Sequence, residues 1–340
     1  MKKMISMILA VVMLLALLTA CGSPAASDTD NSGDGTQDAT PIVIRIGHSS
    51  GESSDWQQAL LVFKEDLEER SNGTLKVEIY PNETLGPELD NITGIQQGHC
   101  EGVLSGEALT NWTPYAALVS MPYACASMEA AEKIADSEEI GGVIEKNIIE
   151  TAKLHPIGYF LRSARNLTSS KEIRSFDDVA GLKIRVPNNK LSIALWTAFG
   201  ASATPMAWSE VFTSLQNGTI QAQENPSTTI YDNNLFEVQD YLIKTEHTIS
   251  WIYVCLGEDF WQSLTAEQQN MIDASAKVMN DWQHDYLMQS VDEVEAKLGE
   301  KMTIIDIDKT PFIEAALQVV KEEVDADVYA LYEKMVEMGK

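Results

Sequence analysis

Apolar and polar residues alternate in the first regular stretch of the chain. Residues 42–46 are apolar at every second position, which predicts a strand ended by Gly47. Ser54 and Gln57 then form a capping-box pattern, which predicts a helix that ends at Arg70. The pattern therefore opens with a strand followed by a helix.

The same alternation continues beyond this unit. A second strand is predicted over residues 75–79, a short helix over 89–95 and a third strand near Val103. Strands that alternate with helices are typical of a parallel sheet with right-handed crossovers.

Ligands of parallel sheets bind at the carboxyl ends of the strands. The loops 48–54 and 105–110 are expected at these ends, because each follows a predicted strand. His48 and Glu107 are therefore candidate ligand-binding residues.

A second series of strands and helices begins with a strand over residues 157–161. A stretch at 248–256 is β-branched and aromatic, which predicts a long strand that returns to the first domain. Between them the pattern predicts a strand over 182–186 ended by Pro187, a helix over 190–199, a helix capped by Ser209, and a strand over 220–224 broken at Pro226.

Thr265 and Gln268 form another capping box, at the start of a helix that extends to Leu298. A helix of this length spans about 50 Å, enough to lie across two domains. The tail supplies a strand over 303–307 and a helix that begins at Thr310-Pro311.

These elements predict an α/β fold of two domains, and the length of 340 residues is sufficient for both. The expected boundaries place residues 41–162 and 251–290 in domain I, and residues 163–250 and 291–340 in domain II.

The N-terminal residues have the pattern of an export signal. Lys2 and Lys3 precede an apolar run over residues 4–18, and the sequence Leu-Thr-Ala-Cys ends at Cys21. This order resembles a bacterial lipoprotein signal, in which residues 1–20 are removed and Cys21 is acylated. An uncleaved membrane anchor is the alternative. Residues 21–40 lack large apolar side chains apart from Cys21 and predict a flexible linker that tethers the protein to the outer face of the cell membrane.

Composition excludes several classes of protein. A net charge of -27 argues against nucleic-acid binding, which depends on many Lys and Arg contacts to phosphate. The five histidines are isolated, and no nucleophile elbow, phosphate-binding loop or dinucleotide fingerprint occurs. We therefore expect no enzyme, no metal and no cofactor. Cys100, Cys125 and Cys255 are widely spaced, which favours buried thiols over a disulfide framework, with one bridge as the alternative.

Basic residues concentrate in one window of this acidic chain. Residues 153–190 contain eight Lys and Arg against three Asp and Glu, and four of the six arginines of the chain lie there. Arginine matches a carboxylate or phosphate with two parallel hydrogen bonds, so the window indicates an anion site. The alternative is a basic surface with ordinary ion pairs.

Arg185 ends a predicted strand, where its guanidinium should project into a crevice. Asn225 precedes a proline in an extended conformation and offers an amide to a ligand, and Arg165 lies where the chain enters the second domain. As alternatives, Arg185 pairs with Asp177 or Asp178, and Asn225 caps a turn. Trp208 and Trp196 either line the cleft or belong to the core.

Several motifs resemble the solute-binding proteins of TRAP (tripartite ATP-independent periplasmic) transporters, of the DctP type. The shared stretches are Gly181-Leu182-Lys183-Ile184-Arg185-Val186-Pro187-Asn188, Thr204-Pro205-Met206, Ser209-Glu210-Val211, Gln223-Glu224-Asn225-Pro226, Phe236-Glu237-Val238-Gln239, Tyr80-Pro81-Asn82 with Leu85-Gly86, Met121-Pro122-Tyr123, and Arg165 with Thr168-Ser169. The resemblance covers nearly all of the chain from Ile42 to Trp282.

The resemblance implies a periplasmic-binding-protein-like fold, with two α/β domains joined by hinge strands around a cleft and a long helix behind both. It further implies capture of an organic acid by Arg185, with Arg165 as the second arginine and Asn225 as the polar partner. The sequence departs from the family's pattern at Gln221-Ala222 and at Gly106-Glu107. These departures affect the identity of the ligand.

We therefore expect a monomeric lipoprotein that captures a C4-dicarboxylate, a uronate or another sugar acid by closing its cleft, and delivers it to small and large membrane subunits. A type II binding lipoprotein of an ABC transporter is the alternative, and a lipid-anchored hydrolase is a more distant one.

Overall fold

The computed structural model describes residues 40–339. The predicted signal peptide, the predicted acylation site at Cys21 and the predicted linker up to residue 39 lie outside these residues. None of the described helices is long and apolar enough to cross a membrane.

The first sheet has five strands in the order β2-β1-β3-β10-β4. β1 pairs in parallel with β2 and β3, as the alternation of strands and helices predicts, and β10 runs antiparallel between β3 and β4. The strands are β1 (Ile42–Gly47), β2 (Leu75–Tyr80), β3 (Gly102–Ser105), β4 (Leu154–Arg162) and β10 (Ser250–Gly257).

The sequence pattern suggests that β4 begins a second series of strands and helices. In the structure it does not. It pairs with β10 along its whole length, from Leu154 opposite Gly257 to Arg162 opposite Ser250, and so belongs to the first sheet. The return of β10 to this sheet is confirmed.

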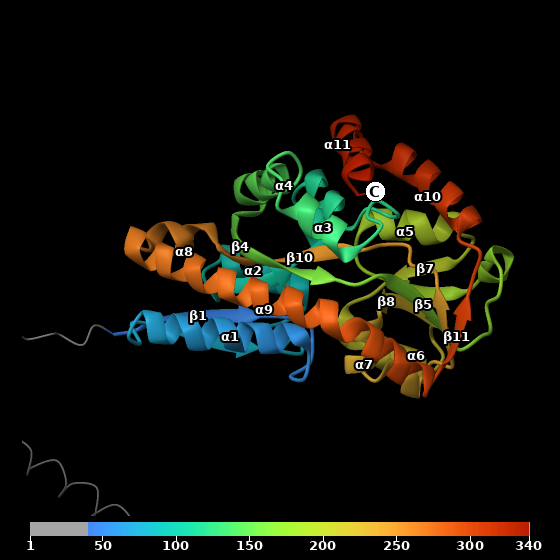
Figure 1. The fold of residues 1–340 in the computed structure, drawn as a ribbon, viewed down its shortest axis with the longest axis horizontal. Coiled ribbons are helices and arrows are strands. Elements are labelled where there is room, and N and C mark those ends of the chain that lie inside the picture. The colour runs from blue at the N-terminus through green and yellow to red at the C-terminus, as the bar shows by residue number, and fades with distance from the viewer. Residues whose placement is uncertain (1–39, 340) are drawn as a thin grey trace, which may run out of the picture. The chain divides into compact units, whose positions relative to one another are not determined.

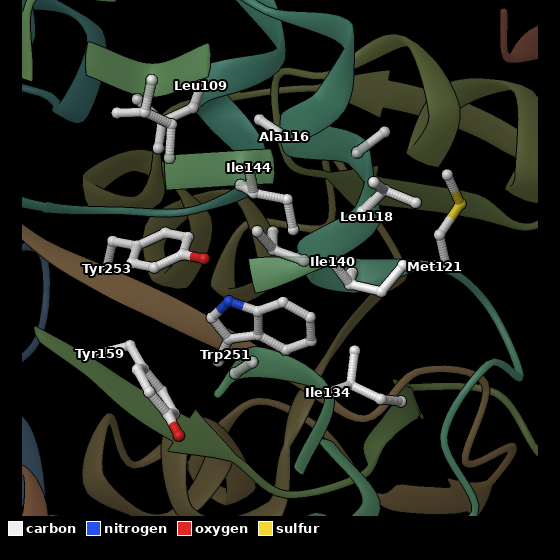
Figure 2. Close-up of a cluster of buried hydrophobic side chains, with 14 of the residues drawn as sticks. Leu109, Ala116, Leu118, Met121, Ile134, Ile140, Ile144, Tyr159, Trp251 and Tyr253 are labelled. Carbon is white, nitrogen blue, oxygen red and sulfur yellow. The ribbon is translucent and has the colours of Figure 1, made fainter. Parts of the chain in front are cut away.

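Both faces of the first sheet are buried. The odd-numbered β10 residues, among them Trp251 and Tyr253, pack into a cluster with Leu118 and Ile134, which Figure 2 shows. The even-numbered residues pack on the other face, where α1 and the first half of α9 (Ala266–Gly299) lie. The helices that cover this sheet are α1 (Asp55–Arg70), α2 (Glu88–Gln96), α3 (Met128–Ala135), α4 (Gly141–Asn147) and α8 (Glu258–Ser263), with the 3₁₀ helices η1 (Glu107–Asn111) and η2 (Pro114–Ser120).

Ser54 caps α1 as predicted, since its side chain accepts from the backbone N–H of Gln57. The Gln57 side chain does not complete the capping box. Its Oε1 lies 2.8 Å from Nε2 of His48 and fixes that ring instead.

The second sheet has six strands in the order β11-β9-β5-β8-β6-β7, with β5 antiparallel between β8 and β9. β8 ends at Pro226, as predicted, although Asn225 and Pro226 still belong to the strand and Pro226 pairs with Arg165. The strands are β5 (Arg165–Ser169), β6 (Lys183–Val186), β7 (Ser202–Pro205), β8 (Ala222–Pro226), β9 (Tyr241–Lys244) and β11 (Thr303–Asp306).

The helices of the second sheet include α5 (Lys190–Ala198), α6 (Val211–Gln216), α7 (Ser227–Asp232) and α10 (Thr310–Glu323). The predicted cap of α6 by Ser209 is wrong, because the 3₁₀ turn η5 (Trp208–Glu210) precedes α6 and the helix has no side-chain cap. The Ser209 N–H donates instead to Oε2 of Glu83, at 3.1 Å. We call the first sheet with its helices the first lobe, and the second sheet with its helices the second lobe.

Helix α9 (Ala266–Gly299) spans both lobes, as predicted (Figure 1). Its capping box of Thr265 and Gln268 is present. Ile272 and Met279 pack into the core of the first lobe, whereas Leu298 packs into that of the second.

Helix α11 (Ala326–Met338) departs from the expected division of the chain. Its residues Val328, Tyr332 and Met335 pack into the core of the first lobe, although the sequence placed residues 291–340 with the second. The precise domain boundaries stay a prediction. Cys100, Cys125 and Cys255 are buried and free, which confirms their interpretation as buried thiols.

Candidate ligand-binding site

Two adjoining cavities, of about 200 and 70 Å³, lie between the lobes. The first lobe contributes residues from the two predicted loops after β1 and β3, and the second contributes the end of β6. Both cavities are lined by Ser49, Glu88, Glu107, Arg185, Pro187 and Trp208. We call them together the cleft.

Arg185 enters the cleft from the end of β6 and is buried. Its Nε and Nη2 donate to the carbonyl of Met206 at 3.1 and 2.8 Å, and its guanidinium carbon lies 5.4 Å from the ring centroid of Trp208. Arg185 makes no ion pair with any described residue, and the alternative pairing with Asp177 or Asp178 is therefore excluded. Burial lowers the pKa of Arg185 to about 10, because the charge has lost water and forms no ion pair, although the more distant charge of Glu224 acts to raise it.

Arg165 is also buried, but its guanidinium already has a carboxylate partner. Its Nε lies 2.5 Å from Oε2 of Glu224 and its Nη2 lies 2.7 Å from Oε1, a bidentate pair. Nε2 of His247 lies 2.9 Å from the same Oε2. Burial acts to raise the pKa of Glu224, but Arg165 and His247 hold it well below its usual range. Arg165 thus lines the smaller cavity, but most of its guanidinium N–H groups already donate to Glu224.

Arg162 of the first lobe connects the two lobes through hydrogen bonds of its guanidinium. Nη1 of Arg162 donates to Oε1 of Glu107 at 2.9 Å, and its Nη2 donates to Oδ1 of Asn225 at 3.3 Å. The guanidinium also stacks over Trp56, at 5.7 Å from the ring centroid. Burial acts to raise the pKa of Glu107, but the charges of Arg162 and Arg165 lower it below its ordinary value. The Glu107 carboxylate therefore stays ionised.

Asn225 is part of β8 and lines the smaller cavity, so it does not cap a turn. Its Nδ2 donates to Oε1 of Gln223 at 2.7 Å, which fixes the orientation of the amide. The sequence left two positions possible for Trp208, the cleft and the core. In the structure Trp208 is half-buried and lines the cleft. Trp196 is a core residue, 1% exposed, against Phe199.

His48 does not line either cavity of the cleft, whereas its neighbour Ser49 does. The His48 ring is 3% exposed and bonds to Gln57, and burial lowers its pKa. The structure thus brings Arg185, Arg165, Asn225, Glu107 and Trp208 together at the cleft and leaves His48 behind it.

Sequence reasoning missed several residues of the cleft, and also Glu224, the buried partner of Arg165. Arg162 stood in the basic window but was not singled out, and Glu224 stood in the Gln-Glu-Asn-Pro motif beside Asn225. Glu88, the first residue of α2, and Trp56, on α1, carried no local signal. No group of three His, Cys, Asp or Glu side chains among residues 40–339 is arranged to hold a metal ion.

Two α/β lobes, with a buried arginine in the cleft between them that has no carboxylate partner among the described residues, define a binding protein for small anions. Comparison with known proteins places the chain within this class. Residues 46–327 match the model of the DctP family, described as bacterial extracellular solute-binding protein, family 7. The chain therefore belongs to this family and is a solute-binding protein of the TRAP type.

Relatives have been described in several bacteria. The chain is 41% identical to the solute-binding protein RD1_1052 of Roseobacter denitrificans over 298 residues, which cover 87% of this chain and 91% of the relative. It is 28% identical to the 2,3-diketo-L-gulonate-binding periplasmic protein YiaO of Escherichia coli over 289 residues, 84% of this chain and 88% of the relative.

Solved structures agree with the fold. A TRAP periplasmic solute-binding protein from Roseobacter denitrificans, with bound L-galactonate, is similar at a TM-score of 0.84 and 41% identity, over 86% of this chain and 98% of that one. One from Haemophilus influenzae, with bound L-gulonate, gives 0.82 and 26%, over 87% and 99%. These relatives are extracytoplasmic binding proteins and not enzymes, so the ABC-type and hydrolase alternatives are set aside.

Proposed function

We propose that this protein captures a sugar acid with one carboxylate in the cleft and delivers it to the small and large membrane subunits of a TRAP transporter. The observation that carries the proposal is the isolation of Arg185. Among the described residues that line the cleft, it is the arginine without a carboxylate partner. A ligand carboxylate beside it would restore the interaction that burial has removed.

The balance of charge in the cleft favours a monoanion. Arg162 and Arg165 are compensated by Glu107 and Glu224. Arg185 is the cation left to pair with a ligand carboxylate, and the other charged residues that line the larger cavity, Glu83, Glu88, Asp90 and Glu107, are acidic. A C4-dicarboxylate would bring a second negative charge, which no remaining cation on the described wall neutralises.

The relatives support the same class of solute. Two similar structures hold L-galactonate and L-gulonate, each a polyhydroxy acid with one carboxylate. The half-buried Trp208 suits such a ligand, since an indole ring offers an apolar face to the C–H groups of a sugar chain.

We propose cleft closure as the capture step. Contacts between the lobes at the rim of the cleft support it. Ser209 of the second lobe donates to Glu83 of the first, and Nδ2 of Asn111 donates to the carbonyl of Asn188 at 3.5 Å. From the sequence we further propose that Cys21 carries the lipid anchor and that the protein acts as a monomer outside the cell membrane.

A thermal-shift screen tests the function. L-Galactonate, L-gulonate, D-galacturonate, succinate and uncharged galactose would be added to the purified protein. Because a ligand bound to the native state raises the melting temperature, we expect a rise with at least one sugar acid and none with galactose. A rise with succinate and with none of the sugar acids would contradict the proposal.

A further inference from the structure

Glu88 stands on the wall of the cleft formed by the first lobe, whereas Arg185 stands on the wall formed by the second. Glu88 is the first residue of α2 and lines both cavities, as Arg185 does. The two side chains form no ion pair with each other, so Glu88 does not neutralise Arg185. The cleft therefore presents a cationic group on one wall and a carboxyl group on the other.

Protein contacts fix one side of the Glu88 carboxyl group. Oγ of Ser105, at the end of β3, donates to its Oε1 at 2.6 Å. This bond holds the carboxyl group in place and leaves further acceptor capacity toward the cavity. Glu88 is thus positioned as a rigid hydrogen-bonding group for a ligand.

The surroundings of Glu88 make it a poor neighbour for a second anion. Asp90 and Glu83 line the larger cavity with it, and Glu107 lines both cavities. Burial and the charge of Glu107 raise the pKa of Glu88 to about 7, against the opposing effects of Ser105, the Gly106 backbone and Arg162. A carboxylate placed here would meet several acidic groups in a partly desolvated space.

Hydroxyl groups fit this wall. A sugar hydroxyl donates to a carboxylate oxygen and accepts from a protonated carboxyl group, so it bonds to Glu88 in either state. A solute that places its carboxylate at Arg185 and its hydroxyl chain along the wall of the first lobe would satisfy both sides of the cleft.

We propose that Glu88 is a specificity-determining residue, which hydrogen-bonds to hydroxyl groups of the solute and rejects a second carboxylate at that end. The inference rests on the proposed function and deepens it. It narrows the solute class to acids with one carboxylate and a free hydroxyl chain, as distinct from dicarboxylates of the same length.

Calorimetry with a matched pair of ligands tests the inference. L-Galactonate and galactarate have the same carbon chain length and differ by a hydroxymethyl group against a second carboxylate at one end. We expect the wild-type protein to bind galactonate more tightly. In Glu88→Gln, which removes the negative charge and keeps the shape, we expect the preference to fall by about tenfold, because the repulsion is lost.

Two variants provide controls. Glu69→Gln changes an exposed acidic residue of α1 that lines neither cavity, and its preference should stay within about twofold of the wild type. Glu88→Asp keeps the charge, so it should still reject galactarate while it binds galactonate more weakly. If Glu88→Gln does not fold, the Glu88→Asp result decides: acceptance of galactarate would overturn the inference.

The outcomes separate the inference from the function on which it rests. Galactonate binding with an unchanged preference in Glu88→Gln, or an equal change in Glu69→Gln, would overturn the role of Glu88 alone. A wild-type protein that binds no sugar acid in the wider screen would contradict the proposed function, and with it this inference.

Discussion

Arg165 and Glu224 form a bidentate ion pair in the interior of the protein, with Nε 2.5 Å from Oε2 and Nη2 2.7 Å from Oε1. Both residues are buried, at 4% and 2% exposure. The pair joins neighbouring strands, because Arg165 begins β5 and Glu224 lies in β8. Because Arg165 is already paired with Glu224, it is not available to an anionic ligand. Arg185 forms no ion pair with a described residue and is available.

Loss of the Glu224 carboxylate should destabilise the protein strongly. In Glu224→Gln, the charge of Arg165 would remain buried without its main partner, which typically costs about 3–5 kcal/mol. Urea unfolding measures this change. Glu172→Gln, which removes the exposed partner of Arg174, is the control and should cost less than about 1 kcal/mol. Equal losses in the two variants would show that the buried pair has no special role.

Stability should fall as pH rises toward neutrality, in part because of Asp232. Burial and the nearby Asp55 of α1 raise the pKa of Asp232 to about 7, and Tyr286 of α9 also faces it. The folded protein therefore binds a proton that the unfolded chain releases near its ordinary pKa of 3.8. The stabilisation is fully present below about pH 4, is lost progressively as pH rises toward about 7, and is absent above that value.

Asp232→Asn should reduce this dependence. We expect its melting temperature to exceed that of the wild type at about pH 8, and to approach it only at about pH 4, near the ordinary pKa at which the unfolded Asp232 also becomes protonated. Scanning calorimetry at the two pH values measures the difference. Asp285→Asn, an exposed change on α9, is the control. A parallel pH dependence in wild type and Asp232→Asn would contradict the assignment.

The contact between Glu83 and Ser209 should slow release of the ligand. Glu83 is held in a left-handed conformation, with φ of 56°, and its carboxylate accepts from the Ser209 N–H across the rim of the cleft. Its removal in Glu83→Ala eliminates a charge-assisted bond between the lobes. We expect the dissociation rate of the ligand to increase by about tenfold.

Stopped-flow fluorescence measures this rate. Glu52→Ala, an exposed change in the loop after β1, serves as the control and should leave the rate unchanged. An unaltered dissociation rate in Glu83→Ala would show that the rim contact does not hold the lobes together.

Much of the fold could be predicted because its signals are local. The alternation over 42–46 and the capping box at Thr265 each appear in the structure where the pattern put them. The position of β4 could not be read in the same way. Its sheet is decided by pairing with β10, about a hundred residues later in the chain, and no local pattern records such a contact.

The difference between local signals and contacts distant in the sequence also explains which site residues could be predicted. Arg185 could be predicted because it ends a strand within a basic window. The pairing of Arg165 could not, since its partner Glu224 lies 59 residues away. Glu88 was missed because a glutamate at the start of a helix is an ordinary sequence feature. Its place in the cleft follows from the packing of α2 beside β3, which brings it to Ser105.

The central claim is that Arg185 holds the carboxylate of the solute, and Arg185→Lys tests it most directly. A lysine keeps the charge but cannot form two parallel hydrogen bonds to a carboxylate, so we expect affinity for the sugar acid to fall by about tenfold or more. Arg174→Lys, at an exposed ion pair, is the matched control and should bind as the wild type does. Isothermal titration calorimetry on the folded variants gives both values. Unchanged affinity in Arg185→Lys would contradict the account.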